Sequence, residues 1–156
     1  MKKICTLSLA LTLAGCASTD YSEFDMSTAA LSNIVVKEKA ELEQRKHEIQ
    51  VSFDYVINGF HADENLYHCS VQFLNTDGTS MTSIKGRKLP CRIDASEGNI
   101  SINWPSPLDK SRNSPKEVLS TIKYPVEYFV AIHQKTGVKT NNIIGKSDVI
   151  LSKIKI

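Results

Sequence analysis

The sequence lacks the spaced motifs by which most enzyme sites are recognised. It contains no HExxH zinc motif and no Gly-x-Ser-x-Gly nucleophile elbow. Gly86-Arg87-Lys88 lacks the earlier glycine that a phosphate-binding loop requires. No two cysteines stand in a CxxC pair, so a zinc ribbon or a CxxC redox centre is not indicated. These absences favour a protein that is not an enzyme and that holds no metal or other cofactor.

The sequence also lacks a charge excess and a long apolar run. The formal charge is +2, but Lys2 and Lys3 precede every acidic residue, and the chain after residue 15 has 17 basic and 17 acidic residues. A neutral domain does not supply the concentrated positive field that nucleic acid needs, so we expect no nucleic-acid partner. The apolar run from Ile4 to Leu13 is shorter than the roughly 20 residues of a permanent membrane span.

What the N-terminus does contain is an export signal. Lys2 and Lys3 precede the short apolar run, and small residues follow it. The residues Leu13-Ala14-Gly15-Cys16 resemble the lipobox of bacterial lipoproteins. The resemblance implies that residues 1–15 are a signal peptide removed before Cys16, that the Cys16 thiol carries a diacylglycerol, and that a further acyl chain such as palmitate can join the new amino group. Two or more acyl chains give stable membrane attachment.

The residue after Cys16 bears on location. It is Ala17 and not aspartate, and in lipoproteins generally the absence of aspartate there implies the outer membrane. We therefore expect a chain that is anchored to the outer membrane by its N-terminal lipid and faces the periplasm. Residues 16–32 would be the lipidated N-terminus and tether, and residues 33–156 one folded domain.

The remaining cysteines are predicted to pair. Cys5 leaves with the signal peptide and Cys16 carries lipid, so Cys69 and Cys91 remain in an oxidising compartment where disulfides persist. The competing interpretation, a metal ligand or catalytic thiol, lacks a second ligand pair. We expect a Cys69–Cys91 disulfide.

Alternation of apolar and polar residues predicts strands along most of the domain, separated by turn residues such as Asn58-Gly59 and Asp77-Gly78. Residues 34–45 are ambiguous: period-2 alternation favours a strand, whereas good helix formers and a Glu41/Arg45 spacing are compatible with a helix. Ser114-Pro115-Lys116-Glu117 predicts a capping box and a helical turn near 115–121. A final strand is expected over Val149–Ile156.

These elements predict an all-β fold, an immunoglobulin- or fibronectin-like β-sandwich of about seven strands with at most one short helix. The tryptophan that true antibody domains place between two cysteines is missing, because Trp104 follows both cysteines. The similarity is therefore one of architecture.

Several side chains are candidates for chemistry or binding. His61, Asp63, Glu64 and His68 form the best metal candidate, although a solvated loop without metal is the preferred interpretation. His47 is expected in an exposed turn and His133 at an exposed strand end. Lys85, Arg87, Lys88 and Arg92 form a basic cluster whose expected role is a charged strand edge. The alternative is contact with anionic headgroups, lipopolysaccharide or an acidic protein partner. The Pro105–Pro115 stretch is the best candidate binding loop, and an ordinary connection between strands is the equal alternative.

The leading hypothesis is a lipid-anchored cell-envelope protein whose domain binds or scaffolds another envelope component without catalysis. One alternative is an accessory lipoprotein for assembly of a secretion system or pilus. A small metal-dependent enzyme centred on His61 and His68 is the third. The sequence does not identify a small-molecule ligand.

Overall fold

The computed structural model describes residues 25–63, 66–81, 91–138 and 140–154. The signal peptide, Cys16, most of the tether, Glu64 and the cluster residues Lys85, Arg87 and Lys88 lie outside these ranges. The long strands are β1 (Ala29–Glu41), β2 (Lys46–Ile57), β3 (Tyr67–Leu74), β5 (Glu97–Pro105), β6 (Glu127–Lys135) and β7 (Asn141–Lys146). Two short strands, β4 (Arg92–Ile93) and β8 (Ile150–Leu151), and one helix, α1 (Lys116–Thr121), complete the fold with the 3-10 turns η2 (Leu42–Gln44) and η3 (Lys110–Arg112).

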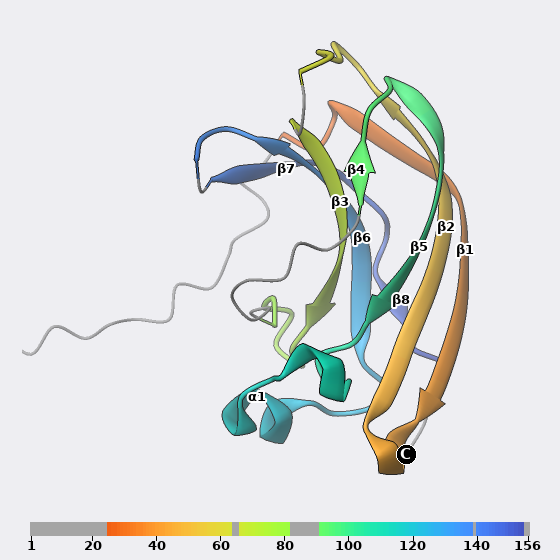
Figure 1. The fold of residues 1–156 in the computed structure, drawn as a ribbon, viewed down its shortest axis with the longest axis vertical. Coiled ribbons are helices and arrows are strands. Elements are labelled where there is room, and N and C mark those ends of the chain that lie inside the picture. The colour runs from red at the N-terminus through yellow and green to blue at the C-terminus, as the bar shows by residue number, and fades with distance from the viewer. Residues whose placement is uncertain (1–24, 64–65, 82–90, 139, 155–156) are drawn as a thin grey trace, which may run out of the picture.

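The strands form two antiparallel sheets that pack face to face, as Figure 1 shows. One sheet has the order β1-β2-β5, and the other has the order β4-β3-β6-β7 with β8 also paired to β6. An immunoglobulin constant domain likewise places its first, second and fifth strands in one sheet and its third, sixth and seventh in the other. Here the fourth strand pairs with the third instead of the fifth. The predicted all-β sandwich is confirmed.

Alternation along the strands builds the core between the sheets. Ile49, Val51, Phe53 and Tyr55 point inward from β2 and are at most 6% exposed, while the residues between them lie on the outer face. Tyr128, Val130 and Ile132 do the same on β6, which lies between β3 and the β7–β8 side of its sheet. A second small cluster, Leu74, Phe129, Ala131 and Ile143, lies on the opposite face of that sheet.

The ambiguous segment is a strand. In β1 the even-numbered residues from Ile34 to Ala40 are partly buried and Val35, Lys37, Lys39 and Glu41 are exposed, as the period-2 pattern predicts. A β-bulge lies between Ser32 and Val35, where Asn33 has a φ of 51°. The strand begins at Ala29, earlier than the expected domain start at residue 33. Gly145 of β7 permits this early start, because a Cβ there would lie 2.3 Å from the Ala29 carbonyl oxygen.

The predicted disulfide is present. Cys69 of β3 and Cys91, just before β4, are joined with their Cα atoms 5.2 Å apart, and both are buried in the main core. The Cys69 N–H donates to the Cys91 carbonyl at 3.2 Å, so the bridge joins neighbouring segments of one sheet. It closes a loop of 22 residues. The position differs from the antibody bridge, which crosses between the sheets.

Two local predictions need correction. Helix α1 forms where expected, but the capping box does not: Pro115 occupies the N-cap position, and the Ser114 hydroxyl donates instead to the Pro107 carbonyl. The final strand is also shorter than predicted. Within the described part of this segment only Ile150 and Leu151 form a strand with β6, because the Lys153 N–H turns to Glu38 on β1.

The domain has two distinct ends. The chain enters β1 at Ala29, opposite Ile57, and the β6–β7 turn lies at this same end. The turn between β1 and β2, the Pro105–Pro115 loop and α1 lie at the other end (Figure 1). Among the residues that the structure describes, no helix is long and apolar enough to cross a membrane.

Candidate functional site

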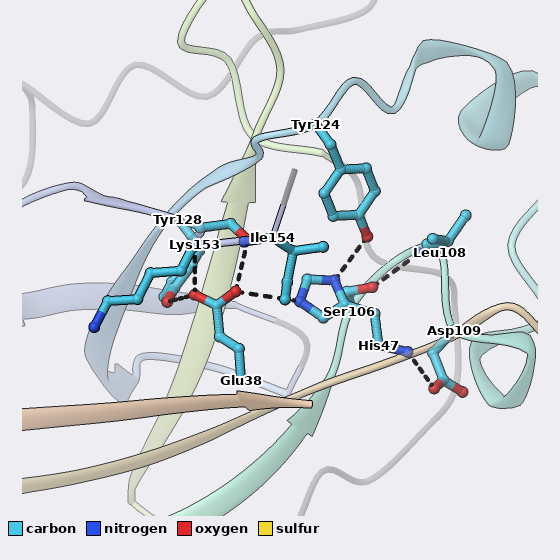
Figure 2. Close-up of polar contacts among 10 residues, drawn as sticks. Glu38, His47, Ser106, Leu108, Asp109, Tyr124, Tyr128, Lys153 and Ile154 are labelled. Atoms are coloured by element: carbon cyan, nitrogen blue, oxygen red, sulfur yellow. Dashed lines mark hydrogen bonds and ion pairs between the residues drawn. The ribbon is translucent and has the colours of Figure 1, made fainter. Parts of the chain in front are cut away.

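A buried polar network closes the end of the sandwich that carries α1. Figure 2 shows the imidazole of His47 between the phenol of Tyr124 and the carboxylate of Glu38. Glu38 comes from β1 and His47 from the start of β2, while Tyr124 precedes β6 in the chain. The side chain of His47 is 0% exposed and that of Glu38 is 5% exposed. The network therefore joins both sheets in the interior.

Glu38 is held by donors from β6 and from the segment that follows β8. Its carboxylate accepts hydrogen bonds from the Tyr128 hydroxyl at 2.9 Å, the Ser152 hydroxyl at 2.6 Å and the Lys153 N–H at 3.3 Å. Burial by itself raises the pKa of Glu38, but these hydrogen bonds and nearby His47 outweigh it and hold the pKa below its ordinary value. Glu38 is consequently ionised at neutral pH, and burial together with the adjacent charge raises the pKa of Tyr128.

His47 is neutral, because burial lowers its pKa even though Glu38 and Asp109 act in the opposite direction. Its Nδ1 lies 2.7 Å from the Tyr124 hydroxyl, and its Nε2 lies 3.6 Å from a Glu38 oxygen. A lone pair on Nε2 would face a negative charge, so we assign the proton to Nε2 and let Tyr124 donate to Nδ1. The Nε2 separation is too long for a hydrogen bond, which leaves this N–H attracted by the carboxylate but unpaired.

The same network fixes the Pro105–Pro115 loop. The Ser106 N–H donates to the His47 carbonyl at 2.8 Å, and the His47 N–H donates to the Asp109 carboxylate at 3.1 Å. Asp109 also caps η3 by accepting from the Ser111 N–H at 2.8 Å, and the Lys110 N–H donates to the Arg45 carbonyl. Ser106, 1% exposed, hydrogen-bonds Tyr124 in turn. This loop is thus a fixed part of the domain and not a loose connection.

A Tyr-His-Glu series is typical of proton transfer in enzymes, but its position here favours a structural role. The expectation that His47 occupies an exposed turn is wrong: it begins an inward-facing alternation, and its ring is completely enclosed. A general base must come within about 3 Å of the group it deprotonates. Since the His47 ring is 0% exposed, a substrate in solvent does not reach it in this conformation.

A second polar row lies on the outer face of the β3–β6 pair. His68 and His133 are directly opposite in the strand register, and their rings stack at 4.7 Å with an angle of 6°. Gln72 donates to the Ser70 oxygen at 2.6 Å, and the Ser70 hydroxyl shares a second hydrogen bond, also of 2.6 Å, with His133 Nε2. Burial and nearby His68 lower the pKa of His133 to about 4, contrary to the expected exposed strand end.

The Ser70–His133 contact has only part of the arrangement found in hydrolases. In a catalytic triad a third group, usually a carboxylate, orients the histidine. In the part of the chain that the structure describes, the ring next to His133 is His68, which is neutral because burial lowers its pKa as well. The row joins β3 and β6 across the outer face of the sheet.

The metal hypothesis receives no support from these contacts. His68 faces His133 and not His61, whose backbone N–H donates to the Tyr67 hydroxyl at 3.3 Å. Within the described ranges, no group of three or more histidine, cysteine or carboxylate side chains is arranged to hold a metal ion. Of the basic cluster, Arg92 is described, and it forms an ion pair with Asp94 beside it.

An open hollow lies next to α1, at the same end as the buried network. It has a volume of about 170 Å³ and is bordered by the turn after β3, the segment leading into β6, and β8. A neighbouring hollow of about 220 Å³ shares Asn75, Met81 and Thr121 with it and adds Glu117 and Val118 of α1. The walls of the first are Leu74, Asn75, Thr76, Met81, Thr121, Lys123, Pro125, Val126, Glu127 and Leu151.

Sequence reasoning missed the buried network and the hollow. A signal for the network existed: Glu38 and His47 occupy apolar positions of alternating strands, and a charged residue in such a position requires a partner. The identity of that partner was not readable, because Tyr128 and Ser152 are separated from Glu38 by 90 and 114 residues. The hollow combines three separate segments and has no local pattern.

Comparison with protein-family models, with curated proteins and with solved structures finds no match to this chain. Its function is therefore argued from its own residues.

Replacing Glu38 tests whether an ionised carboxylate holds the network together. In Glu38→Gln the amide NH₂ faces hydroxyl donors, and we expect the free energy of unfolding at pH 7 to fall by about 2 kcal/mol. Because folding lowers the pKa of Glu38 from 4.5, its stabilising contribution is present above that pH and is lost as pH falls below it. Urea unfolding at pH 7 and pH 3.5 should therefore show a smaller difference between variant and wild type at the lower pH.

Glu41→Gln on the same strand is the matched control for this experiment. Glu41 forms an exposed ion pair with Lys46 at 3.0 Å. Its loss should change stability by less than about 0.5 kcal/mol. Equal effects of the two substitutions, or a loss of stability in Glu38→Gln that does not depend on pH, would show that the ionised carboxylate does not hold the network together.

His133 should make the domain less stable in mild acid. The unfolded chain takes up the proton below the ordinary pKa of 6.5, whereas folded His133 resists it down to about 4. The contribution of neutral His133 to the free energy of unfolding is therefore fully present above pH 6.5. It decreases by up to about 3 kcal/mol as pH falls to about 4. His133→Gln keeps a polar partner for Ser70 and should flatten the pH dependence of urea unfolding in this range. His61→Gln, in an exposed loop, should leave it unchanged, and equal slopes for His133→Gln and wild type would contradict the expectation.

Proposed function

We propose that this chain is a lipid-anchored protein of the bacterial outer membrane whose β-sandwich binds another envelope component without catalysis. The observation that carries the proposal is that the tether and the hollow lie at opposite ends of the domain. The chain from Cys16 enters at the Ala29 end, and the α1 hollow and the Pro105–Pro115 loop lie at the opposite end. A tether at one end and a shaped surface at the other suit a module held near a membrane to engage a partner.

The lining of the hollow favours a protein partner. It combines apolar atoms of Met81, Val126 and Leu151 with amide and hydroxyl groups, and it carries both Lys123 and Glu127. Mixed walls of this kind suit a peptide segment, which offers apolar side chains together with backbone donors and acceptors. They do not provide the one-signed field that a nucleic acid requires.

The buried network would make this surface ready for binding. Ser106, Asp109 and Tyr124 are fixed by internal hydrogen bonds, so the loop and the segment entering β6 are ordered before any partner arrives. Ordering a surface in advance reduces the entropy lost on binding. The histidine and carboxylate would then serve rigidity, which is consistent with their enclosure in the interior.

The anchor is tested by Cys16→Ser. We expect that this variant no longer incorporates an alkyne palmitate analogue and is no longer found in the detergent-soluble membrane fraction, because the thiol is the proposed site of lipid attachment. Cys5→Ser is the matched control, since it changes a leader cysteine and should leave labelling intact. Continued labelling of the Cys16→Ser chain would reject the lipoprotein assignment.

The binding surface is tested by site-specific photocrosslinking in living cells. A photoreactive amino acid at Thr121, exposed on α1 and bordering both hollows, should capture a defined envelope protein. The same amino acid at Thr140, exposed beside the β6–β7 turn at the tether end, should not capture that protein. The same captured species at both positions, or none at Thr121, would argue against the hollow as the binding surface.

A further inference from the structure

The free edge of β5 differs from the edges that β1, β4, β7 and β8 present among the described residues. β5 is a nine-residue strand that pairs with β2 in one unbroken register, and no described strand lies beyond it. Between Gly98 and Trp104 it contains no charged residue and no proline. Exposed edges of this kind are templates for pairing with another strand, and proteins usually protect them.

The other described edges carry such protection. β1 has a bulge between Ser32 and Val35, exposes Lys37 and Lys39, and turns the charged Glu38 inward. On the second sheet, β4 and β8 are two residues long each, and β7 has a register shift against β6 and ends at Lys146. Bulges, lysines, inward charges and short strands all discourage edge pairing. The open edge of β5 is thus a specific feature of this domain.

The direction of the backbone groups on β5 follows from its hydrogen bonds. Ser106 donates to the His47 carbonyl, and Ile57 donates to the Ser96 carbonyl, so even-numbered residues of this segment bond to β2. Backbone groups alternate sides along a strand. The N–H and C=O groups of Asn99, Ser101 and Asn103 therefore point to the open edge, and their side chains lie on the exposed outer face.

The sequence of this edge is palindromic. Asn99-Ile100-Ser101-Ile102-Asn103 reads identically in both directions about Ser101. When such a strand pairs antiparallel with a copy of itself, serine meets serine, asparagine meets asparagine, and isoleucine meets isoleucine. We propose that two copies of this chain associate through their β5 edges, with a two-fold axis at Ser101.

This pairing satisfies the exposed backbone without a charge conflict. Three residue pairs would exchange about six N–H···O bonds. Ile100 and Ile102, which already pack against the core, would extend it across the junction. Glu97 would lie opposite the partner's Pro105, so like charges do not meet along the strand. The result is a continuous sheet from β1 of one copy to β1 of the other.

The symmetry also fixes how the two domains are oriented. Antiparallel β5 strands place the α1 hollows at opposite ends of the pair and the two tether entries likewise. Both N-terminal tethers reach the same membrane when the two β5 strands lie parallel to its surface. The dimer would then present two equivalent hollows, whether or not the hollow binds the proposed partner.

Cysteine crosslinking of the full chain in the cell envelope tests the pairing. In Ser101→Cys the new thiols face each other across the axis, where Cα atoms of a bonded pair lie about 5.5 Å apart, within disulfide range. Mild oxidation should give a covalent homodimer on a non-reducing gel, and reduction should abolish it. Ser52→Cys, the cross-strand neighbour on central β2, is the matched control and should remain monomeric, as should wild type.

Each contrary result has a definite meaning. A monomeric Ser101→Cys chain would overturn the proposal, and so would equal crosslinking at residue 52, which indicates random collision. A covalent adduct with a different protein would show that another partner occupies the edge and would overturn the assignment to a second copy.

A charge substitution supplies an independent measurement on the purified, lipidated chain. Ser101→Lys places two ammonium groups together at the axis and should raise the dimer dissociation constant about fivefold or more by sedimentation equilibrium in detergent. Ser52→Lys adds the same charge one strand away from the edge and should leave the constant within about twofold of wild type. Equal effects of the two lysines, or no dimer in wild type, would overturn the proposal.

Discussion

The buried carboxylate of Glu38 is the constraint around which one end of this sandwich is organised. An ionised group inside a protein is tolerated only when hydrogen bonds replace the water it has lost. Three donors do so here, and they come from β6 and from the segment that follows β8. Both sheets and the C-terminal segment are therefore held in one arrangement by a single side chain.

The network also explains how an irregular stretch with several prolines becomes ordered. Prolines between 105 and 115 remove backbone donors, so this segment does not pair as a strand. Its order comes instead from Ser106 and Asp109, which bond to the backbone of His47. Because His47 is itself positioned by Tyr124 and Glu38, the order of the loop depends on the buried network.

The two sheets differ in how they meet the surroundings. The outer face of β3 and β6 carries the stacked His68 and His133 and a small apolar cluster, whereas the outer face of β2 and β5 carries polar and charged side chains. The disulfide fixes β3 to the segment before β4, and β4 pairs with β3, so that no strand among the described residues lies beyond β5.

The local features were predictable from the sequence: period-2 alternation indicated the long strands, Ser114-Pro115 indicated α1, and the number of cysteines left after Cys5 and Cys16 indicated the Cys69–Cys91 pair. The sequence also indicated the lipobox that underlies the proposed anchor. Three contacts could not be predicted from the sequence and are known from the tertiary structure. Glu38 and His47 meet inside the core, His133 stacks on His68, and β4 pairs with β3. The physical reason is range: alternation reports which face a residue occupies, whereas these contacts join residues 9 to 65 positions apart whose meeting depends on how the sheets are assembled.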